Sequence, residues 1–326
     1  VSQYGKIEED GLYEFMHDAD FSIDEVKDSF DLPNVDLPNF KSNFFDEPSK
    51  PVESDDDVPE VKETDIKLGD LFQLGEHRLL CGDATSKEDV ERLMDGQKAD
   101  MVYTDPPYGM FLNADYSSMK DSRTGTKGSK FKNVEGDHDE YDPRPVIEMF
   151  SYCKEQFWFG ADYYSDRLPG KNDGSWIVWD KRSDVETTPE TTVNTDRVFG
   201  SCFELCWSLS RHKRSIARIM WSGKFVGNTA REHDGIQKHV HPTQKPVALP
   251  IWFFDRWGKD KTNIVDIYLG SGSTLIACEK TGRKCFGMEI DPQYCQVIID
   301  RWEQFTGKKA EKLNGQEEEK ESASGS

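Results

Sequence analysis

The stretch that decides the fold is residues 263–305, NIVDIYLGSGSTLIACEKTGRKCFGMEIDPQYCQVIIDRWEQF. Its hydrophobic pattern predicts a strand, a helix, a second strand and a second helix, over residues 263–267, 273–280, 284–289 and 292–305. Gly270-Ser271-Gly272 forms a turn after the first strand, and Gly282 ends the first helix. Strand, helix and strand in this order form a βαβ unit, which indicates an α/β fold with a parallel sheet.

The glycine turn has the features of a ligand loop. Glycines at the carboxyl end of a strand let the backbone pass close to a ligand, and the N-terminus of the following helix favours a carboxylate. Glu289 ends the next strand, where an acid can accept both ribose hydroxyls of a nucleoside cofactor. This loop alone is equally compatible with a methyl donor and with NAD. Leu275 stands where a dinucleotide fingerprint has its third glycine, which favours the methyl donor.

A second motif, Asp105-Pro106-Pro107-Tyr108, follows an apolar run at 100–103 that we expect to be a buried strand. The two prolines hold φ at about −65° and lack N–H donors, so the turn offers carbonyl acceptors. An exocyclic amino group needs acceptors because its lone pair is delocalised into the ring. Asp105 and the Pro106 carbonyl would accept its two hydrogens, and Tyr108 would stack on a base turned out of its helix. The alternative is an ordinary turn at a strand end.

The rest of the ordered chain begins near Leu71 and alternates strands with helical stretches. Further strands are expected at residues 77–81, 156–159, 176–179 and 203–209, and a helix at 87–94 with Ser86 as its N-cap. Four tryptophans alternate with apolar residues on these strands and are expected to be core: Trp158, Trp176, Trp179 and Trp207.

The charge of the chain is concentrated at its ends. The net charge is −21 over 326 residues, and residues 1–65 alone carry −15. We interpret 1–65 as an acidic linker or loosely docked arm, 66–305 as the ordered domain and 306–326 as a disordered tail. Surface charge is screened over about 10 Å at ordinary salt, so the acidic ends do not exclude a nucleic-acid partner for the domain.

Seven scattered cysteines, an odd number, indicate a reduced, intracellular protein. Cys202 and Cys206 have no second ligand pair at metal-binding spacing, so no metal is expected. No apolar run approaches the roughly 20 residues that cross a bilayer, and we expect a cytoplasmic protein without a membrane partner.

Taken together, the motifs resemble the amino-methyltransferases of DNA, in the subgroup whose catalytic tetrapeptide precedes the glycine loop. The resemblance covers about residues 72–303 and includes four further segments in the family's order, at 157–163, 176–181, 203–207 and 241–246. It implies a circularly permuted, Rossmann-like methyltransferase fold at 66–305, with a mostly parallel sheet of seven to eight strands flanked by helices. It also implies S-adenosylmethionine as the cofactor. Gly75–Thr85 is similar to phage-type members that are often joined to a partition-protein-like domain, which implies a bacterial or phage-encoded protein with such a domain upstream.

The resemblance also implies roles for residues. The catalytic residues would be Asp105, Pro106, Pro107 and Tyr108. The cofactor site would comprise Asp83, Ala84, Asp105, His241, Thr243, Lys245, Asp266, Leu269, Gly270, Ser271, Gly272, Thr274, Glu289 and Ile290. Within it, Asp83 would face the adenine amino group, and Thr243 and Lys245 the methionine carboxylate. Ile267 and Tyr268 depart from the family's usual Pro and Phe, and Ser273 replaces a common Thr.

Two basic clusters are candidates for DNA contact. Lys120, Arg123, Lys127 and Lys130 lie in a loop at about 113–137, which we expect to be mobile and to close on the DNA backbone. Its alternative is a solvated surface loop. Arg211, Lys213 and Arg214, with His212 and Arg218, lie where the family has its target-recognition segment, at about 210–240. This short segment predicts that the protein reads a short site or little sequence at all. A homodimer is compatible with the sequence.

The predicted function is site-specific methylation of the exocyclic amino group of a flipped base in DNA, in the manner of restriction-modification enzymes. An Asp before the two prolines favours adenine N6, and cytosine N4 is the alternative. Methylation of RNA or of protein glutamine is a rival, but those families place the glycine loop before the tetrapeptide. A non-catalytic DNA-binding module of the same fold is a second rival. Each enzymatic reading requires residues 105–108 and 270–272 to meet at one edge of the sheet.

Overall fold

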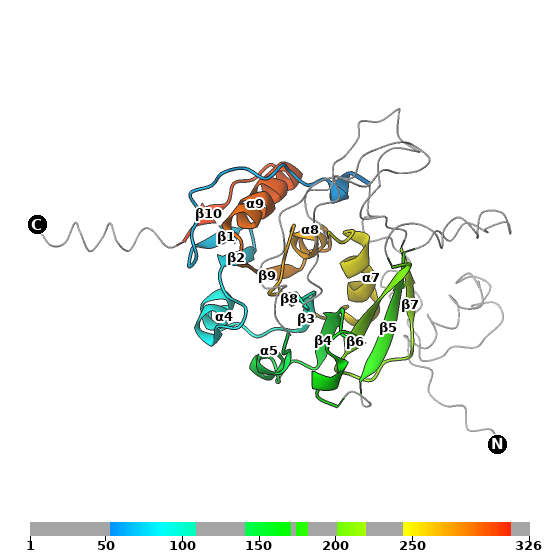
Figure 1. Cartoon of the computed structure of the whole chain (residues 1–326). Helices are drawn as coiled ribbons and strands as arrows, with labels where there is room; N and C mark the ends of the chain where they lie inside the picture. The colour runs from blue at the N-terminus through cyan, green and yellow to red at the C-terminus, as the bar shows by residue number, and fades with distance from the viewer. Residues whose placement is uncertain (1–52, 109–140, 171–173, 182–200, 220–243, 314–326) are drawn as a thin grey trace, which may run out of the picture. The chain divides into compact units, whose positions relative to one another are not determined.

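A computed structural model describes residues 53–108, 141–170, 174–181, 201–219 and 244–313. The chain divides into two units, Val1–Lys50 and Pro51–Ser326, and every described residue belongs to the second. This unit is a layered α/β structure with one continuous sheet and helices on both of its faces (Figure 1). None of the described helices has the length and apolarity needed to cross a membrane.

The sheet contains ten strands in the described residues, in the order β10-β1-β2-β9-β8-β3-β4-β6-β5-β7. The strands are β1 (Leu71–Leu74), β2 (His77–Cys81), β3 (Met101–Thr104), β4 (Glu155–Phe159), β5 (Ser175–Asp180), β6 (Phe203–Ser208), β7 (Ile216–Arg218), β8 (Asn263–Asp266), β9 (Lys284–Glu289) and β10 (Glu311–Lys312). The five central strands, β2, β9, β8, β3 and β4, run parallel, whereas β1, β10 and β6 pair antiparallel with their neighbours. The predicted α/β class with a mostly parallel sheet is confirmed.

The predicted number of seven to eight strands is too low. The extra strands include β1, β7 and β10, which have four, three and two residues and lie at or next to the sheet edges. Segments this short cannot show the alternating pattern by which a strand is recognised in a sequence. They form because neighbouring strands already present unpaired backbone groups.

The helices are η1 (Glu53–Asp56), α4 (Lys87–Met94), α5 (Arg144–Met149), η2 (Ser165–Arg167), α7 (Ala248–Trp257), α8 (Ser273–Lys280) and α9 (Pro292–Thr306). Ser86 caps α4 as predicted, because its side chain accepts a hydrogen bond from the amide of Asp89. Helix α7 was not predicted from the sequence, because it is apolar on most sides and shows no clear alternation of apolar and polar faces. Five of its ten residues are buried.

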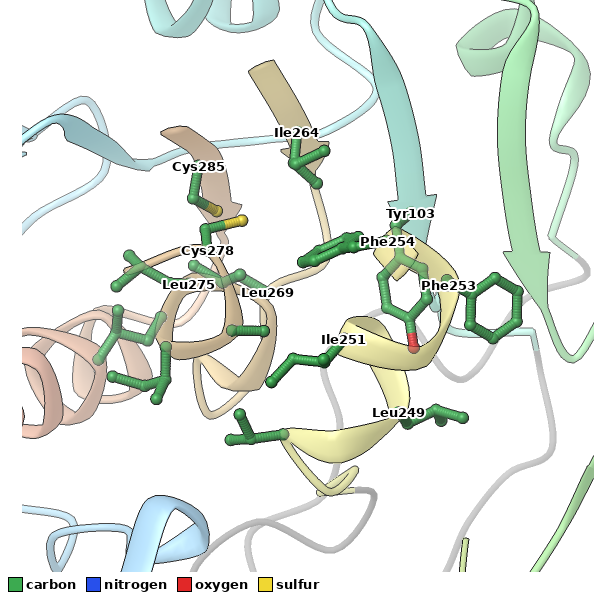
Figure 2. Packing of buried hydrophobic residues seen from close by; sticks show 14 of the residues in the cluster. Tyr103, Leu249, Ile251, Phe253, Phe254, Ile264, Leu269, Leu275, Cys278 and Cys285 are labelled. Atoms are coloured by element: carbon green, nitrogen blue, oxygen red, sulfur yellow. The ribbon is translucent and has the colours of Figure 1, made fainter. Parts of the chain in front are cut away.

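Alternation along the strands divides the core into two layers. Met101 and Tyr103 of β3 belong to the layer under α7, α8 and α9, whereas Val102 belongs to the layer under α4 and α5. Figure 2 shows Tyr103 beside Phe253 and Phe254 of α7, with Ile264 and the residues of α8 continuing the same layer. Three of the tryptophans, Trp158, Trp179 and Trp207, are fully buried, which confirms their place in the core.

Contacts of the domain extend beyond the predicted limits of 66 and 305. At the C-terminal side, β10 pairs with β1. At the N-terminal side, the carboxylate of Asp55 lies 2.6 Å from Lys280 Nζ, and the Asp55 carbonyl accepts a hydrogen bond from Arg301 Nη2 at 2.8 Å. Asp56 Oδ1 accepts one from the amide of Val247 at the start of α7. An acidic stretch that looks solvated in the sequence therefore meets cations buried in the domain.

We expect Asp55→Ala to destabilise the domain by about 3–5 kcal/mol, because it removes the carboxylate that faces the buried Lys280 ammonium. The free energy of unfolding in urea measures this. The matched control is Lys62→Ala, which removes the exposed ion pair with Asp300 and should cost less than about 1 kcal/mol. Equal effects of the two variants would show that η1 is not part of the folded domain.

Candidate functional site

The Asp105–Tyr108 turn and the glycine loop lie at one edge of the sheet because they follow neighbouring parallel strands. Met101 of β3 pairs with Ile264 of β8, and Val102 with Val265. At the carboxyl ends, Thr104 Oγ1 donates a hydrogen bond of 3.0 Å to Asp266 Oδ1. Ligands of open α/β sheets bind at this edge, beside the carboxyl ends of the strands. The structure therefore brings together two motifs that are more than 160 residues apart in the sequence.

The glycine loop is held in a fixed, open conformation. Gly270 and Gly272 have φ values of 57° and 86°, in the left-handed region that disfavours side chains. Below the loop, the buried Asp266 accepts hydrogen bonds from Thr274 Oγ1 at 2.6 Å and from the amide of Tyr268 at 3.2 Å. Behind it, Arg301 Nη1 donates to the carbonyl of Ser271 at 2.8 Å. The loop is thus anchored by its own strand and by α9.

Two more of the predicted cofactor residues end strands at the same edge. Glu289 ends β9, and its two oxygens accept hydrogen bonds from the amides of Gly270 and Asp291, at 2.8 and 3.0 Å. Burial raises the pKa of Glu289 to about 7. Asp83 is exposed and follows β2, whose Cys81 pairs with Glu289, so Asp83 and the buried Ala84 also lie near this edge.

Asp105 is paired on one side only. Its Oδ2 atom forms an ion pair with the ammonium of Lys245. Its Oδ1 atom is buried yet accepts no hydrogen bond from any described residue. Burial raises the pKa of Asp105, and the nearby Lys245 opposes the rise. A buried acceptor without a donor is costly, so its presence indicates a place for a ligand's N–H group.

Lys245 contacts the tetrapeptide in this structure. Its ammonium is directed at the carboxylates of Asp105 and Glu204, the second at 3.6 Å. The carbonyl of Lys245 accepts a hydrogen bond from Ser273 Oγ at the start of α8, which ties this segment to the glycine loop. The structure therefore places Lys245 between the two motifs and pairs it with the tetrapeptide.

Tyr108 forms one wall of the site. Its ring stacks on Tyr163, with ring centroids 4.7 Å apart and an angle of 15° between the rings. Gly160 makes this position accessible, because a Cβ atom there would lie 2.2 Å from Tyr108 Cε1, and its φ of 63° also suits glycine. Tyr163 lies in one of the segments that carry the resemblance, yet it was not predicted as a site residue.

Two further charged residues of the site were missed. Glu204 in β6 and Lys181 after β5 form an ion pair beside Lys245 and Asp105. A signal was present in the sequence, since each charge stands next to an apolar strand pattern where a solvated side chain is not expected. What the sequence does not show is that the two strands are antiparallel neighbours and present these charges at the same edge.

The basic cluster after β6 lies away from this site. Because β6 is antiparallel to β4, its carboxyl end lies at the amino ends of the parallel strands. His212 there contacts Glu155 at the start of β4, at 2.9 Å, and stacks on Trp257. The structure thus places Arg211, Lys213 and Arg214 at the edge opposite Asp105, and their predicted contact with DNA stays a prediction. Arg218 ends β7 opposite Asp180, at the edge of the site.

Several predicted residues lie outside the described part of the chain: His241, Thr243, Lys120, Arg123, Lys127 and Lys130. Leu269 and Ile290 flank the glycine loop and Glu289, and Leu269 is buried whereas Ile290 is exposed. Within the described ranges, no three His, Cys, Asp or Glu side chains are arranged to hold a metal ion.

We expect Asp266→Asn to change the pH dependence of stability. Burial raises the pKa of Asp266 from 3.8 to about 6, so the folded protein keeps this proton to a higher pH than the unfolded chain. The free energy of unfolding of the wild type, relative to Asp266→Asn, should therefore fall by roughly 2–3 kcal/mol between pH 4 and pH 7. Chemical denaturation at several pH values measures it. The control Asp260→Asn, at an exposed carboxyl, should show no such trend.

Comparison with known proteins agrees with this geometry. Residues 190–300 match the N6/N4 family model, described as DNA methylase. The type II methyltransferase M.HinfI of Haemophilus influenzae is 22% identical over 253 residues, 68% of this chain and 67% of that protein. M.HpaI of Haemophilus parainfluenzae is 21% identical over 71% of this chain and 76% of its own length.

Among solved structures, the M1.HpyAVI–SAM complex covers 68% of this chain and 98% of its own, with 20% identity and a TM-score of 0.38. The cytosine-N4-specific PvuII DNA methyltransferase covers 72% and 90%, with 16% identity and a TM-score of 0.39. These scores are low, and the fold assignment rests on the sheet topology described above. The matched family model, the two sequence relatives and the order of the motifs agree that this chain is similar to the amino-methyltransferases of DNA.

Proposed function

We propose that the protein transfers a methyl group from S-adenosylmethionine to an exocyclic amino nitrogen of a base in DNA, with adenine N6 as the favoured target. The observation on which the proposal rests is the buried Asp105 Oδ1 atom, which has no donor among the described residues and lies one strand away from the glycine loop. The matched family model is described as DNA methylase and the two relatives as type II methyltransferases, which supports DNA as the substrate.

The residues at the sheet edge fit this cofactor. The left-handed Gly270 and Gly272 keep the loop free of side chains, so a ligand can lie against its backbone. Glu289 is a partly buried carboxyl group at the end of β9, suited to accept hydrogen bonds from ribose hydroxyls. Asp83 would meet an adenine amino group at the end of β2. When bound, the cofactor supplies a methyl group on a sulfonium, and transfer replaces its C–S bond by a C–N bond.

The tetrapeptide prepares the amino group for this transfer. Asp105 Oδ1 and the Pro106 carbonyl accept its two hydrogens, which draws the lone pair out of conjugation and toward the methyl group. The Asp105 carboxylate also stabilises the positive charge that develops on the nitrogen. The substituted nitrogen then releases one proton to water. Tyr108, held by Tyr163, stacks on the base and fixes its distance from the glycine loop.

The alternatives are distinguished by chain order and by charge. Methyltransferases of RNA or of protein glutamine place the glycine loop before the tetrapeptide, whereas here β3 precedes β8 in the chain. A non-catalytic module would have no use for the buried Asp266 and the partly buried Asp105 and Glu289, whose desolvation costs stability. Cytosine N4 is the remaining alternative to adenine N6. The homodimer, the basic loop at 113–137 and the upstream partition-protein-like domain stay predictions.

We expect Asp105→Ala to lower the methylation rate by about 10²–10³-fold, because the amino group loses its charged acceptor. The affinity for S-adenosylmethionine, measured by calorimetry, should change less than about threefold, because Lys245 keeps Glu204 as a partner. Asp260→Ala, at an exposed loop carboxyl, is the matched control and should behave as the wild type. Turnover of Asp105→Ala at the wild-type rate would contradict the assignment.

The target base is decided by digesting methylated DNA to nucleosides and identifying the product by mass. We expect N6-methyldeoxyadenosine, since the acid before the prolines favours adenine. Detection of N4-methyldeoxycytidine would show that the target is cytosine N4, with the same mechanism. Methylation of RNA with no product in DNA would contradict the proposed substrate.

A further inference from the structure

Four charged side chains meet at the carboxyl edge of the sheet, and only one of them belongs to the tetrapeptide. The Lys245 ammonium forms an ion pair with Asp105 and lies 3.6 Å from Glu204 Oε2. The other oxygen of Glu204, Oε1, forms an ion pair with Lys181. The four side chains are 12–25% exposed, so water screens them only in part.

The two carboxylates of the cluster have different numbers of ammonium partners. Glu204 contacts two ammonium groups, whereas Asp105 contacts one and shares it. Burial acts against both carboxylates, but Lys245 and Lys181 together hold the pKa of Glu204 below its usual value. Burial and the neighbouring Glu204 charge raise the pKa of Asp105, although Lys245 opposes them. Glu204 is thus the more acidic and Asp105 the more basic carboxylate of the two.

The backbone fixes this geometry. Glu204 pairs with Trp179 in the β5–β6 ladder, and the amide of Lys181 donates to the Cys202 carbonyl at 3.0 Å. The Lys181 ammonium lies 4.8 Å from the centroid of the Trp179 ring. The Lys245 ammonium lies 5.2 Å from the centroid of Phe159, so both cations also rest on aromatic rings. Backbone pairing and aromatic contacts therefore hold these charged side chains in place.

We propose that Glu204 and Lys181 are positioning residues for Asp105: they hold the Lys245 ammonium on the Oδ2 side, so that Oδ1 stays a basic acceptor for the amino group of the substrate. This inference rests on the proposed function. It adds two residues that do not touch the substrate but set the strength of the acceptor that does. Glu204 strengthens the acceptor by repulsion, and Lys181 limits this effect by neutralising Glu204.

Among the described residues, the other ionisable groups that face Asp105 are the same in every variant below. They are Asp266 from β8, Tyr103 from β3, Tyr108 from the tetrapeptide, Tyr164 after β4 and Cys206 from β6. Burial raises the pKa of the three phenols and the thiol, so they stay neutral through the range in which carboxylates titrate. A change in the titration of Asp105 between variants therefore reports the effect of the Glu204 or Lys181 charge.

The experiment removes the two charges separately with glutamine, a residue of similar shape. Protein labelled with ¹³C at aspartate carboxyl carbons is titrated by NMR, and the Asp105 signal is identified by its loss in Asp105→Asn. Glu204→Gln should shift the Asp105 titration to lower pH and Lys181→Gln to higher pH, each by about one pH unit. The acidic limb of the pH–rate profile for DNA methylation should move in the same two directions.

Matched controls separate this effect from a structural one. Glu303→Gln and Lys309→Gln remove the same charges from an ion pair at the end of α9 and should move neither titration nor rate profile. Lys181→Arg keeps the charge and should restore the wild-type profile. Shifts in the same direction for Glu204→Gln and Lys181→Gln, or no shift in either, would overturn the inference. If Glu204→Gln does not fold, Lys181→Gln decides alone, and a shift to lower pH or none overturns it.

The two readouts also separate this inference from the proposed function. Opposite NMR shifts with no methylation by the wild-type protein would support the charge arrangement and refute the proposed function. Methylation by the wild type, with an Asp105 titration that neither charge changes, would refute only the role of Glu204 and Lys181.

Discussion

The parallel pairing of β3 with β8 is the constraint on which the rest of the site depends. Asp100 fixes it at the amino ends, where its Oδ2 atom accepts hydrogen bonds from the amides of Thr262 and Asn263, at 3.1 and 3.0 Å. Thr104 and Asp266 fix it at the carboxyl ends. With both ends tied, neither strand can slip, and a slip of one residue would turn Asp266 to the wrong face. The pairing of β3 with β8 thus sets the distance between the tetrapeptide and the glycine loop.

Carboxylates concentrate at the edge that this pairing creates. Asp105, Asp266 and Glu289 all have pKa values raised by burial, so each makes folding less favourable near neutral pH. Such groups are retained where a ligand uses them, and these three surround the place where the cofactor and the target amino group would meet. Lys245 is the cation inside this group, and its own pKa stays high because two carboxylates outweigh its burial. Charge pairing therefore stabilises the site, and Asp105 Oδ1 is left to accept a hydrogen bond from a ligand.

A second set of charges supports the loop from behind. Arg301 is buried and bridges the Ser271 carbonyl to the Asp55 carbonyl, and the Asp55 carboxylate neutralises Lys280. This arrangement connects η1, the glycine loop and α9 behind the cofactor side of the site. On the substrate side, Glu204 and Lys181 have the corresponding place behind Asp105. Both motifs are thus held by charged side chains that are distant from them in the sequence, the glycine loop through hydrogen bonds of Arg301 and Asp105 through its ion pair with Lys245.

Local patterns were enough to predict β9 and α8 at their observed limits, the cap at Ser86 and the identity of both motifs. These features depend on neighbours within a few turns or strand residues, so the sequence by itself determined them. The pairing of Lys245 with Asp105, the places of Glu204 and Lys181, and the docking of Asp55 were decided only by the tertiary structure. So was the position of Arg211–Arg214, which the antiparallel direction of β6 places at the far edge. The physical reason is that a charge in a sequence has no partner until strand order and direction bring one within a few ångströms of it.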